Sequence, residues 1–272
     1  MAVFWHGGGS PPEFRLGKRR KRTYSFPVMT ADMVRNSARR RGFPARGILL
    51  GLALLLALDL GRYLFWPPVS RLAFINPPFT SMMEYRREQQ EARQTEQGKK
   101  PHPPAPRQTW VPLKRMSPHL RKAVVISEDD TFWKHSGFNF STMRDALERN
   151  LKKGRLAAGG STITQQLAKN LWFSPEKSIL RKVKEAIMAC RLELALDKER
   201  ILELYLNVAE WGSGIYGAEA AARHYFGKSA AALTTYEAAS MAAVLPAPLK
   251  RTPSSPLVRK LAARLVKRMP LY

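Results

Sequence analysis

The apolar segment from Gly47 to Trp66 constrains the fold of this 272-residue chain more than any other feature. It has the ~20 residues that an α-helix needs to cross the hydrocarbon core of a bilayer. Basic residues precede it, and it ends in Tyr63 and Trp66, whose rings favour the membrane interface. Asp59 and Arg62 are spaced i,i+3 and can pair near the far interface. We therefore expect an uncleaved transmembrane anchor.

A cleaved signal peptide is the alternative interpretation of this segment. No A-x-A cleavage signal follows it, and Pro67 and Pro68 come at once. Because basic flanks stay in the cytoplasm, residues 1–46 are expected to be a cytoplasmic tail that is mostly disordered. The chain after Pro67 is then extracytoplasmic.

The formal net charge of +25 indicates an anionic partner, such as nucleic acid, anionic lipid headgroups or a phosphorylated substrate. The basic tail is explained by membrane topology, and the remaining charge lacks the pattern of a nucleic-acid-binding module, so no nucleic-acid partner is expected.

The single cysteine, Cys190, lies among apolar positions of a predicted helix and is expected to be a buried thiol. No Cys/His cluster has the spacing of a zinc site.

Composition divides the rest of the chain. Residues 67–109 are expected to form a linker or extended loop, because 84–108 is polar and then proline-rich. A mainly helical domain is expected over 110–250, with helices at 178–196, 198–207 and 235–245 and a loop at 212–217. No strand pattern is visible. Residues 251–272 contain a basic amphipathic helix, interpreted as a solvated face with membrane contact as the alternative.

Three blocks carry the residues that chemistry would use. In the first, Glu128 and Asp129 follow the apolar run 123–126, and Phe132, His135 and Gly137 come shortly after. A carboxylate at the end of a buried run has a raised pKa, which suits proton transfer near neutral pH. A surface turn with capping acids is the simpler interpretation of these residues alone.

The second block, 159–170, begins with two glycines that permit close backbone approach. Thr162 and Gln165 have the spacing of a capping box, which predicts a helix. Gln165 and Lys169 share one face of that helix, and Gln166 and Asn170 share another. Such faces can bind sugar hydroxyls and a phosphate, or they are simply hydrophilic.

In the third block, Arg181 and Lys182 are spaced to pair with Glu185 at i,i+4 and i,i+3. A surface salt bridge is the common outcome. A carboxylate held beside cations near a phosphate site is the functional interpretation.

Together with 201–207 and 212–228, these blocks resemble the ordered motifs of the peptidoglycan glycosyltransferases, glycosyltransferase family 51. The first three motifs are EDxxFxxHxGF, GGSTITQQLxKN and RKxxExxxAxxLE, and the resemblance covers about half of the chain, 111–248. It implies a lysozyme-like, two-lobed, mainly α domain that polymerises lipid II into β-1,4 glycan strands with inversion. No K-T-G motif accompanies the S-x-x-K at 174–177, so no transpeptidase domain is expected.

The resemblance also implies roles for individual residues. Glu128 would be the general base, and Glu185 the second catalytic carboxylate, near the donor diphosphate. Lys182 would contact that diphosphate, and Asp129, Phe132, His135 and Gly137 would support the loop that carries Glu128. The other expected substrate-binding residues are Ser161, Thr162, Gln165, Gln166, Lys169, Asn170 and Arg181. A divalent cation, Mg²⁺ or Mn²⁺, can assist at the diphosphate near Glu185 in the family, although the sequence requires none.

The expected surroundings follow from the same resemblance. The protein is expected in the bacterial inner membrane, with the catalytic domain in the periplasm. Lipid II and the nascent strand are the expected substrates, and other wall-synthesis or division proteins are the expected partners.

A glycan-cleaving lytic enzyme is the nearest alternative, since both need a glutamate beside a sugar groove. A membrane-anchored nucleic-acid binder and a degenerate scaffold are the alternatives from other classes.

Overall fold

The computed structural model describes residues 45–100, 102, 105–153, 159–176 and 178–272. Contacts divide the chain into two units, 1–52 and 53–272. The first unit is described only by the opening residues of helix α2 (Ala45–Gly61), so the predicted cytoplasmic tail lies outside the described residues except for Ala45 and Arg46. The second unit carries all of the other elements.

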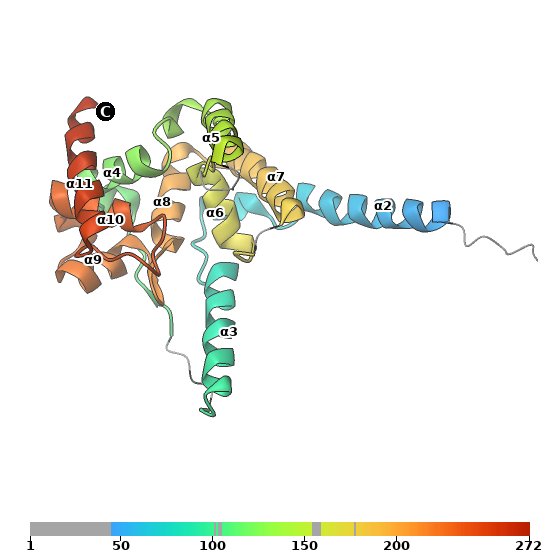
Figure 1. The fold of residues 1–272 in the computed structure, drawn as a ribbon, viewed down its shortest axis with the longest axis horizontal. Coiled ribbons are helices and arrows are strands. Elements are labelled where there is room, and N and C mark those ends of the chain that lie inside the picture. Colours follow the sequence, from blue (N-terminus) through green and yellow to red (C-terminus); the bar gives the residue numbers. More distant parts are fainter. Residues whose placement is uncertain (1–44, 101, 103–104, 154–158, 177) are drawn as a thin grey trace, which may run out of the picture. The chain divides into compact units, whose positions relative to one another are not determined.

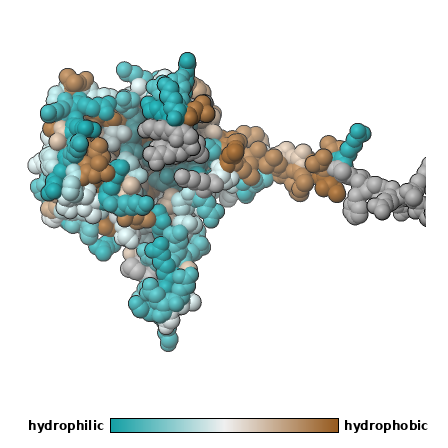
Figure 2. All heavy atoms as spheres, viewed as in Figure 1, coloured by the Kyte–Doolittle hydropathy of each residue, from teal (hydrophilic) through white to brown (hydrophobic). Residues whose placement is uncertain are grey.

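Helix α2 is apolar and uncovered. Its leucines are largely exposed, and hydrophobic colouring runs along its length (Figure 2). The helical stretch Arg46–Ala73 is the one segment, among the residues described, with the length and hydropathy to cross a membrane. The expected pair forms, with Arg62 Nε 3.1 Å from Asp59 Oδ1. These features fit a membrane-anchored protein.

The second unit is mainly helical (Figure 1). Its helices are α3 (Ser81–Glu96), α4 (Pro118–Glu128), α5 (Phe140–Lys153), α6 (Ile163–Trp172), α7 (Ile179–Ala195), α8 (Lys198–Val208), α9 (Ala218–Phe226), α10 (Thr235–Val244) and α11 (Pro256–Arg268). In Figure 1, α4, α9, α10 and α11 lie on one side of α8, and α5, α6 and α7 lie on the other. Helix α10 packs on α4 and α11, and α6 packs on α7 and α8.

Side-chain caps explain where several helices begin. Thr162, Ser178 and Asp197 accept hydrogen bonds from the backbone N–H three residues on, and Thr234 forms a full capping box with Glu237. Each cap satisfies a backbone donor that the first helical turn leaves free. The predicted helix starts near 162, 178 and 198 are therefore confirmed.

The hydrophobic core runs through both groups of helices. Helix α8 contributes Leu202, Leu206 and Tyr205, all at most 1% exposed, and α4 contributes the fully buried Leu120 and Val124. Burying one such leucine stabilises the fold by about 1.5–3 kcal/mol. This packing fixes the C-terminal end of α4, where Glu128 lies.

Part of the expected linker is a helix, because α3 occupies 81–96. Thr80 caps this helix, and Met82 and Met83 are buried. Arg86 on α3 lies 3.0 Å from Glu210, so the helix is tied to the domain by a long-range ion pair. The folded domain thus begins well before residue 110, the expected boundary.

The expected burial of Cys190 is also wrong, because this thiol is exposed. Helix α7 packs through Glu185, Met188, Ala189 and Leu192. The apolar stripe that contains Cys190 therefore faces outward, with Val183 42% exposed and Leu194 87% exposed. The periodicity identified an apolar face but not what that face contacts.

A small sheet lies where a loop was expected. Its strands are β1 (Arg107–Gln108), β2 (Glu210–Gly212) and β3 (Ile215–Tyr216), in the order β1-β3-β2, with β1 parallel and β2 antiparallel to β3. Strands of two or three residues are too short to produce an alternating pattern.

The basic C-terminal helix is α11, and it belongs to the compact unit. Val258, Ala262 and Leu265 of α11 are buried against the rest of the domain. Its basic side chains lie on the other faces, as expected for a solvated surface.

Candidate active site

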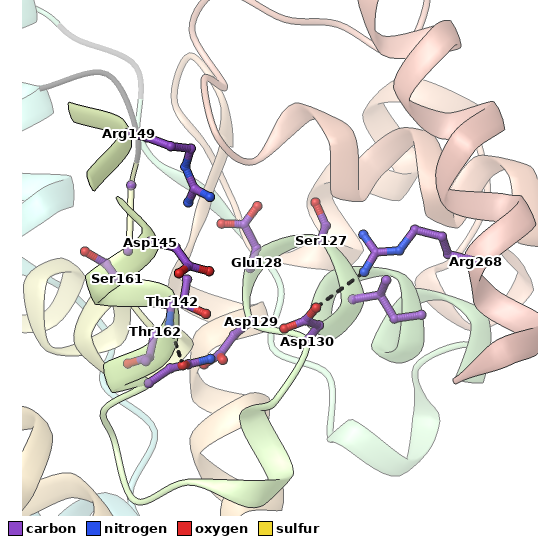
Figure 3. A pocket seen from close by; sticks show the side chains of 14 residues that line it. Ser127, Glu128, Asp129, Asp130, Thr142, Asp145, Arg149, Ser161, Thr162 and Arg268 are labelled. Carbon is purple, nitrogen blue, oxygen red and sulfur yellow. Dashed lines mark hydrogen bonds and ion pairs between the residues drawn. The ribbon is translucent and has the colours of Figure 1, made fainter. Parts of the chain in front are cut away.

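Glu128 lies at the last residue of α4 and lines a cavity of about 320 Å³, here named the Glu128 cavity. Its carboxylate points into the space between α5 and α11 (Figure 3). The polar residues that share this cavity are Ser127, Asp129, Asp130, Asn139, Thr142, Asp145, Arg149, Ser161, Thr162 and Arg268. The structure thus brings Glu128, Asp129, Ser161 and Thr162 together in one cavity.

One oxygen of Glu128 is held and the other is free. Gln166 Nε2 donates to Glu128 Oε2 at 3.0 Å, and Tyr205 donates to Gln166 Oε1 at 3.0 Å. Oε1 of Glu128 is buried and accepts no hydrogen bond from the described residues. Burial raises the pKa of Glu128, and the Gln166 hydrogen bond offsets part of that rise. The arrangement yields an oriented carboxylate whose Oε1 has no competing hydrogen bond from the described residues.

Asp129 ties the loop after α4 to α6. It accepts hydrogen bonds from the backbone N–H of Ile163 at 3.0 Å and from His135 Nε2 at 2.9 Å. Because Gly137 N–H donates to His135 Nδ1, the ring proton belongs on Nε2 and points at Asp129. Thr162 Oγ1 donates to the carbonyl of Gly137, whose φ of 87° is ordinary only for glycine. These residues support Glu128 and do not line up as an acid/base pair with it.

Phe132 completes this support. Its ring is fully buried, and Lys198 Nζ lies 4.4 Å from the ring centroid. A cation over an aromatic face is attracted by the ring quadrupole. The ring therefore packs the Glu128 loop onto α8.

A second group of charges lies on α7. Glu185 is 2% exposed and forms ion pairs with Arg181 and with Lys182 Nζ, the latter at 3.1 Å. Lys182 also donates to Ser161 Oγ at 2.8 Å and to the buried Gln165 at 3.4 Å. Since Ser161 lines the Glu128 cavity, this hydrogen bond places the cations of α7 beside the cavity.

This cation group carries more positive charge than the single carboxylate of Glu185 balances. Burial and the neighbouring charges of Arg181 and Lys169 lower the pKa of Lys182 to about 8. A bound phosphate would relieve the repulsion by placing negative charge beside Lys182 and Arg181. The group therefore has the chemistry of an anion site.

Lys169 and Asn170 line a different cavity from Ser161 and Thr162. With Gln166, Arg86 and Glu210 they line a separate cavity of about 150 Å³, here named the Lys169 cavity. Burial lowers the pKa of Lys169 and raises that of Glu210. Gln165 is hydrogen bonded to Lys182, and Lys169 shares the Lys169 cavity with Glu210.

Several lining residues carried no sequence signal. Thr142, Asp145 and Arg149 come from α5, and Arg268 comes from α11. Gly160 lets α5 approach, because a Cβ there would lie 3.2 Å from Ala146 Cβ. No motif contained the α5 or α11 side chains, and only their place in the fold identifies them.

A divalent cation does not fit at Glu185 on the residues present. Within the described parts of the chain, no three His, Cys, Asp or Glu side chains gather in metal-ligand geometry. The one carboxylate at this place is already paired with two cations. Hard divalent cations need several oxygen ligands, so the protein alone does not supply this site.

Comparison with known proteins identifies the class. The family model described as Transglycosylase matches residues 95–269. The chain belongs to this transglycosylase family, a class of glycosyltransferases with a lysozyme-like, mainly helical domain.

Relatives named biosynthetic peptidoglycan transglycosylase are similar over most of the chain. The protein from Aromatoleum aromaticum is 47% identical over 74% of this chain and 82% of its own length. The protein from Nitrosospira multiformis is 45% identical over 68% of this chain and 79% of its own length. The protein from Thiobacillus denitrificans is 56% identical over 52% of this chain and 61% of its own length.

Proposed function

We propose that the chain is a membrane-anchored peptidoglycan glycosyltransferase that polymerises lipid II into β-1,4 glycan strands and releases undecaprenyl pyrophosphate. One observation carries the proposal. The half-buried carboxylate of Glu128, whose Oε1 has no hydrogen-bond partner among the described residues, shares a cavity with Ser161, which is hydrogen bonded to the cation group on α7. The proposed general base therefore lies close to the cations proposed to bind the leaving group.

Glu128 acts as the general base in this proposal. Its free oxygen takes the proton from the 4-hydroxyl of the acceptor sugar, and that hydroxyl oxygen attacks the anomeric carbon of the growing strand. The raised pKa makes the carboxylate a stronger base, and the Gln166 hydrogen bond keeps it ionised near neutral pH. Attack opposite to the departing group inverts the anomeric centre.

Lys182 and Arg181 bind the donor diphosphate. As the bond between the anomeric carbon and its oxygen breaks, the diphosphate leaves with the electron pair and gains negative charge. The two cations stabilise that charge in a partly buried place, where electrostatic interactions are stronger than in water. Glu185 acts by holding both cations in position and not by transferring a proton.

The same proposal assigns Ser161 and Thr162 to the wall of the substrate cavity, and Gln165 and Gln166 to positioning Lys182 and Glu128. Lys169 and Asn170 line the adjoining Lys169 cavity. Gln166 lines that cavity too, so a substrate-induced shift of its amide would change the lining of the Lys169 cavity and the position of Glu128 together.

The outward apolar side chains of α7 support a membrane-surface location for the domain. Ile179, Val183 and Leu194 are exposed, as are Phe74 and Ile75 near the N-terminal end of the domain. Arg191 donates to the carbonyls of Tyr63 and Pro67, which holds α7 against this segment. Apolar surface of this kind is stabilised at the boundary of a bilayer. We propose that the basic N-terminus is cytoplasmic and the domain periplasmic, where it meets lipid II.

To test this function, the full-length protein in detergent micelles is incubated either with lipid II or with finished peptidoglycan. Polymer formation from lipid II, without release of fragments from peptidoglycan, is the expected result. Cleavage of peptidoglycan without polymerisation would replace the proposal with a lytic activity.

A further inference from the structure

A third cavity opens on the far side of Glu128 from the cation group. It has a volume of about 330 Å³ and is here named the arginine groove. Its lining residues are Ser127, Ala243, Pro246, Arg251, Leu261, Arg264, Leu265 and Arg268. No carboxylate is among these lining residues. The groove is therefore strongly basic over an apolar floor.

The arginine groove is continuous with the Glu128 cavity. Ser127 and Arg268 line both spaces, and Figure 3 shows these two side chains flanking Glu128 on the α11 side. The diphosphate-binding residues proposed above come instead from α7, on the other side of α8 (Figure 1). A substrate that reaches Glu128 from the groove would thus extend away from the diphosphate.

The three arginines keep donors free for a ligand. Arg251 uses one nitrogen to reach the carbonyl of Ala243 at 3.0 Å, and the one contact of Arg268 among the described residues is a long, exposed one of 3.4 Å with Asp130. For Arg264 the described residues provide no hydrogen-bond or ion-pair partner, and its side chain is exposed at the groove. Guanidinium groups bind carboxylates and phosphates with paired N–H donors.

We propose that the arginine groove binds the anionic stem peptide of the acceptor substrate through its carboxylates. The inference rests on the proposed function, since lipid II carries a pentapeptide that ends in a carboxylate. The apolar floor of Ala243, Leu261 and Leu265 suits short aliphatic side chains along such a peptide. The groove thereby favours peptide-bearing disaccharides as acceptors.

A phosphate is the other oxyanion that arginines would bind, so the test separates the two. The full-length protein is assayed with lipid II and with the same lipid-linked disaccharide lacking the peptide. Arg264→Gln is the variant, and Arg259→Gln is the matched control, because Arg259 is exposed on α11 but lies outside the groove. Circular dichroism verifies that both variants are folded.

The proposal expects Arg264→Gln to raise KM for lipid II about tenfold, equivalent to about 1.4 kcal/mol, with kcat nearly unchanged. KM for the peptide-free lipid should not move, and Arg259→Gln should match the wild type with both. An equal rise in KM with both lipids would show that the groove binds the diphosphate. No rise in KM with either lipid would show that the groove does not bind the substrate. Each of these results overturns the proposal. A wild-type protein that polymerises neither lipid would overturn the proposed function itself.

Discussion

Gln166 donates to Glu128 over 3.0 Å, and the opposite end of its amide accepts from Tyr205 over the same distance. Tyr205 is 1% exposed, so its hydroxyl is fixed by the core of α8. The orientation of the proposed base is therefore transmitted from the hydrophobic core through a single amide. A hydrogen bond to a charged group contributes about 1.5–3 kcal/mol, enough to affect both the pKa and the geometry of Glu128.

Replacing Gln166 by alanine should lower kcat by about tenfold or more. The Gln166 bond stabilises the ionised form of Glu128, so its loss should raise the pKa and move the acidic limb of the rate profile to higher pH. Tyr205→Phe keeps the Gln166 amide but no longer fixes its orientation. This variant should lower kcat by less and should also move the acidic limb to higher pH. Measurement of kcat against pH tests both, and an acidic limb that moves to lower pH would contradict the account.

The alkaline limb of kcat/KM should lie near pH 8. Lys182 has a pKa of about 8, and above that pH it loses the positive charge proposed to bind the diphosphate. Lys182→Arg keeps its charge at higher pH, so the limb should move upward or disappear. An unchanged alkaline limb in this variant would show that another group titrates.

Removing Arg86 should destabilise the domain by about 3 kcal/mol, because Glu210 would remain buried without its cation. The pKa of Glu210 is already raised by burial and should rise further in this variant. The loss of unfolding free energy should therefore become smaller as pH falls and the carboxyl takes a proton. Thermal unfolding of Arg86→Ala at two pH values measures this.

Two further variants make the Arg86 result specific. Adding Glu210→Gln should recover most of the lost stability, since the unpaired charge is gone. Arg93→Ala, an exposed position on the same helix, should change the free energy of unfolding by less than about 0.5 kcal/mol. Equal effects at Arg86 and Arg93 would mean that α3 is not an integrated part of the domain.

Asp129→Ala should cost about 2 kcal/mol of unfolding free energy, because it leaves the buried N–H of Ile163 and the ring N–H of His135 without an acceptor. The adjacent Asp130→Ala is the control, since Asp130 is about half exposed and its one side-chain contact among the described residues is at 3.4 Å with Arg268. Similar losses in both variants would contradict the structural role given to Asp129.

Much of the candidate site could be predicted from sequence because it is local. The pairing of Glu185 with Arg181 and Lys182 follows from helical spacing alone, and so do the caps at Thr162 and Asp197. Interactions within one or two turns depend on geometry that every helix shares.

The rest depends on contacts between distant segments. Arg86 meets Glu210 across 124 residues, and Arg268 reaches the Glu128 cavity from the end of the chain, so no local pattern marks either. The burial expected for Cys190 is wrong because hydrophobic periodicity does not distinguish a helix face that packs on protein from one that faces outward.

Polymerisation of lipid II by the Glu128→Gln variant tests the central claim most directly. Glutamine keeps the size of the side chain but cannot accept the proton, so glycan synthesis should fall below about a tenth of the wild-type rate, a barrier increase of at least ~1.4 kcal/mol, while the thermal unfolding midpoint stays close to that of the wild type. A folded variant that retains more than about a tenth of the activity would remove Glu128 as the base.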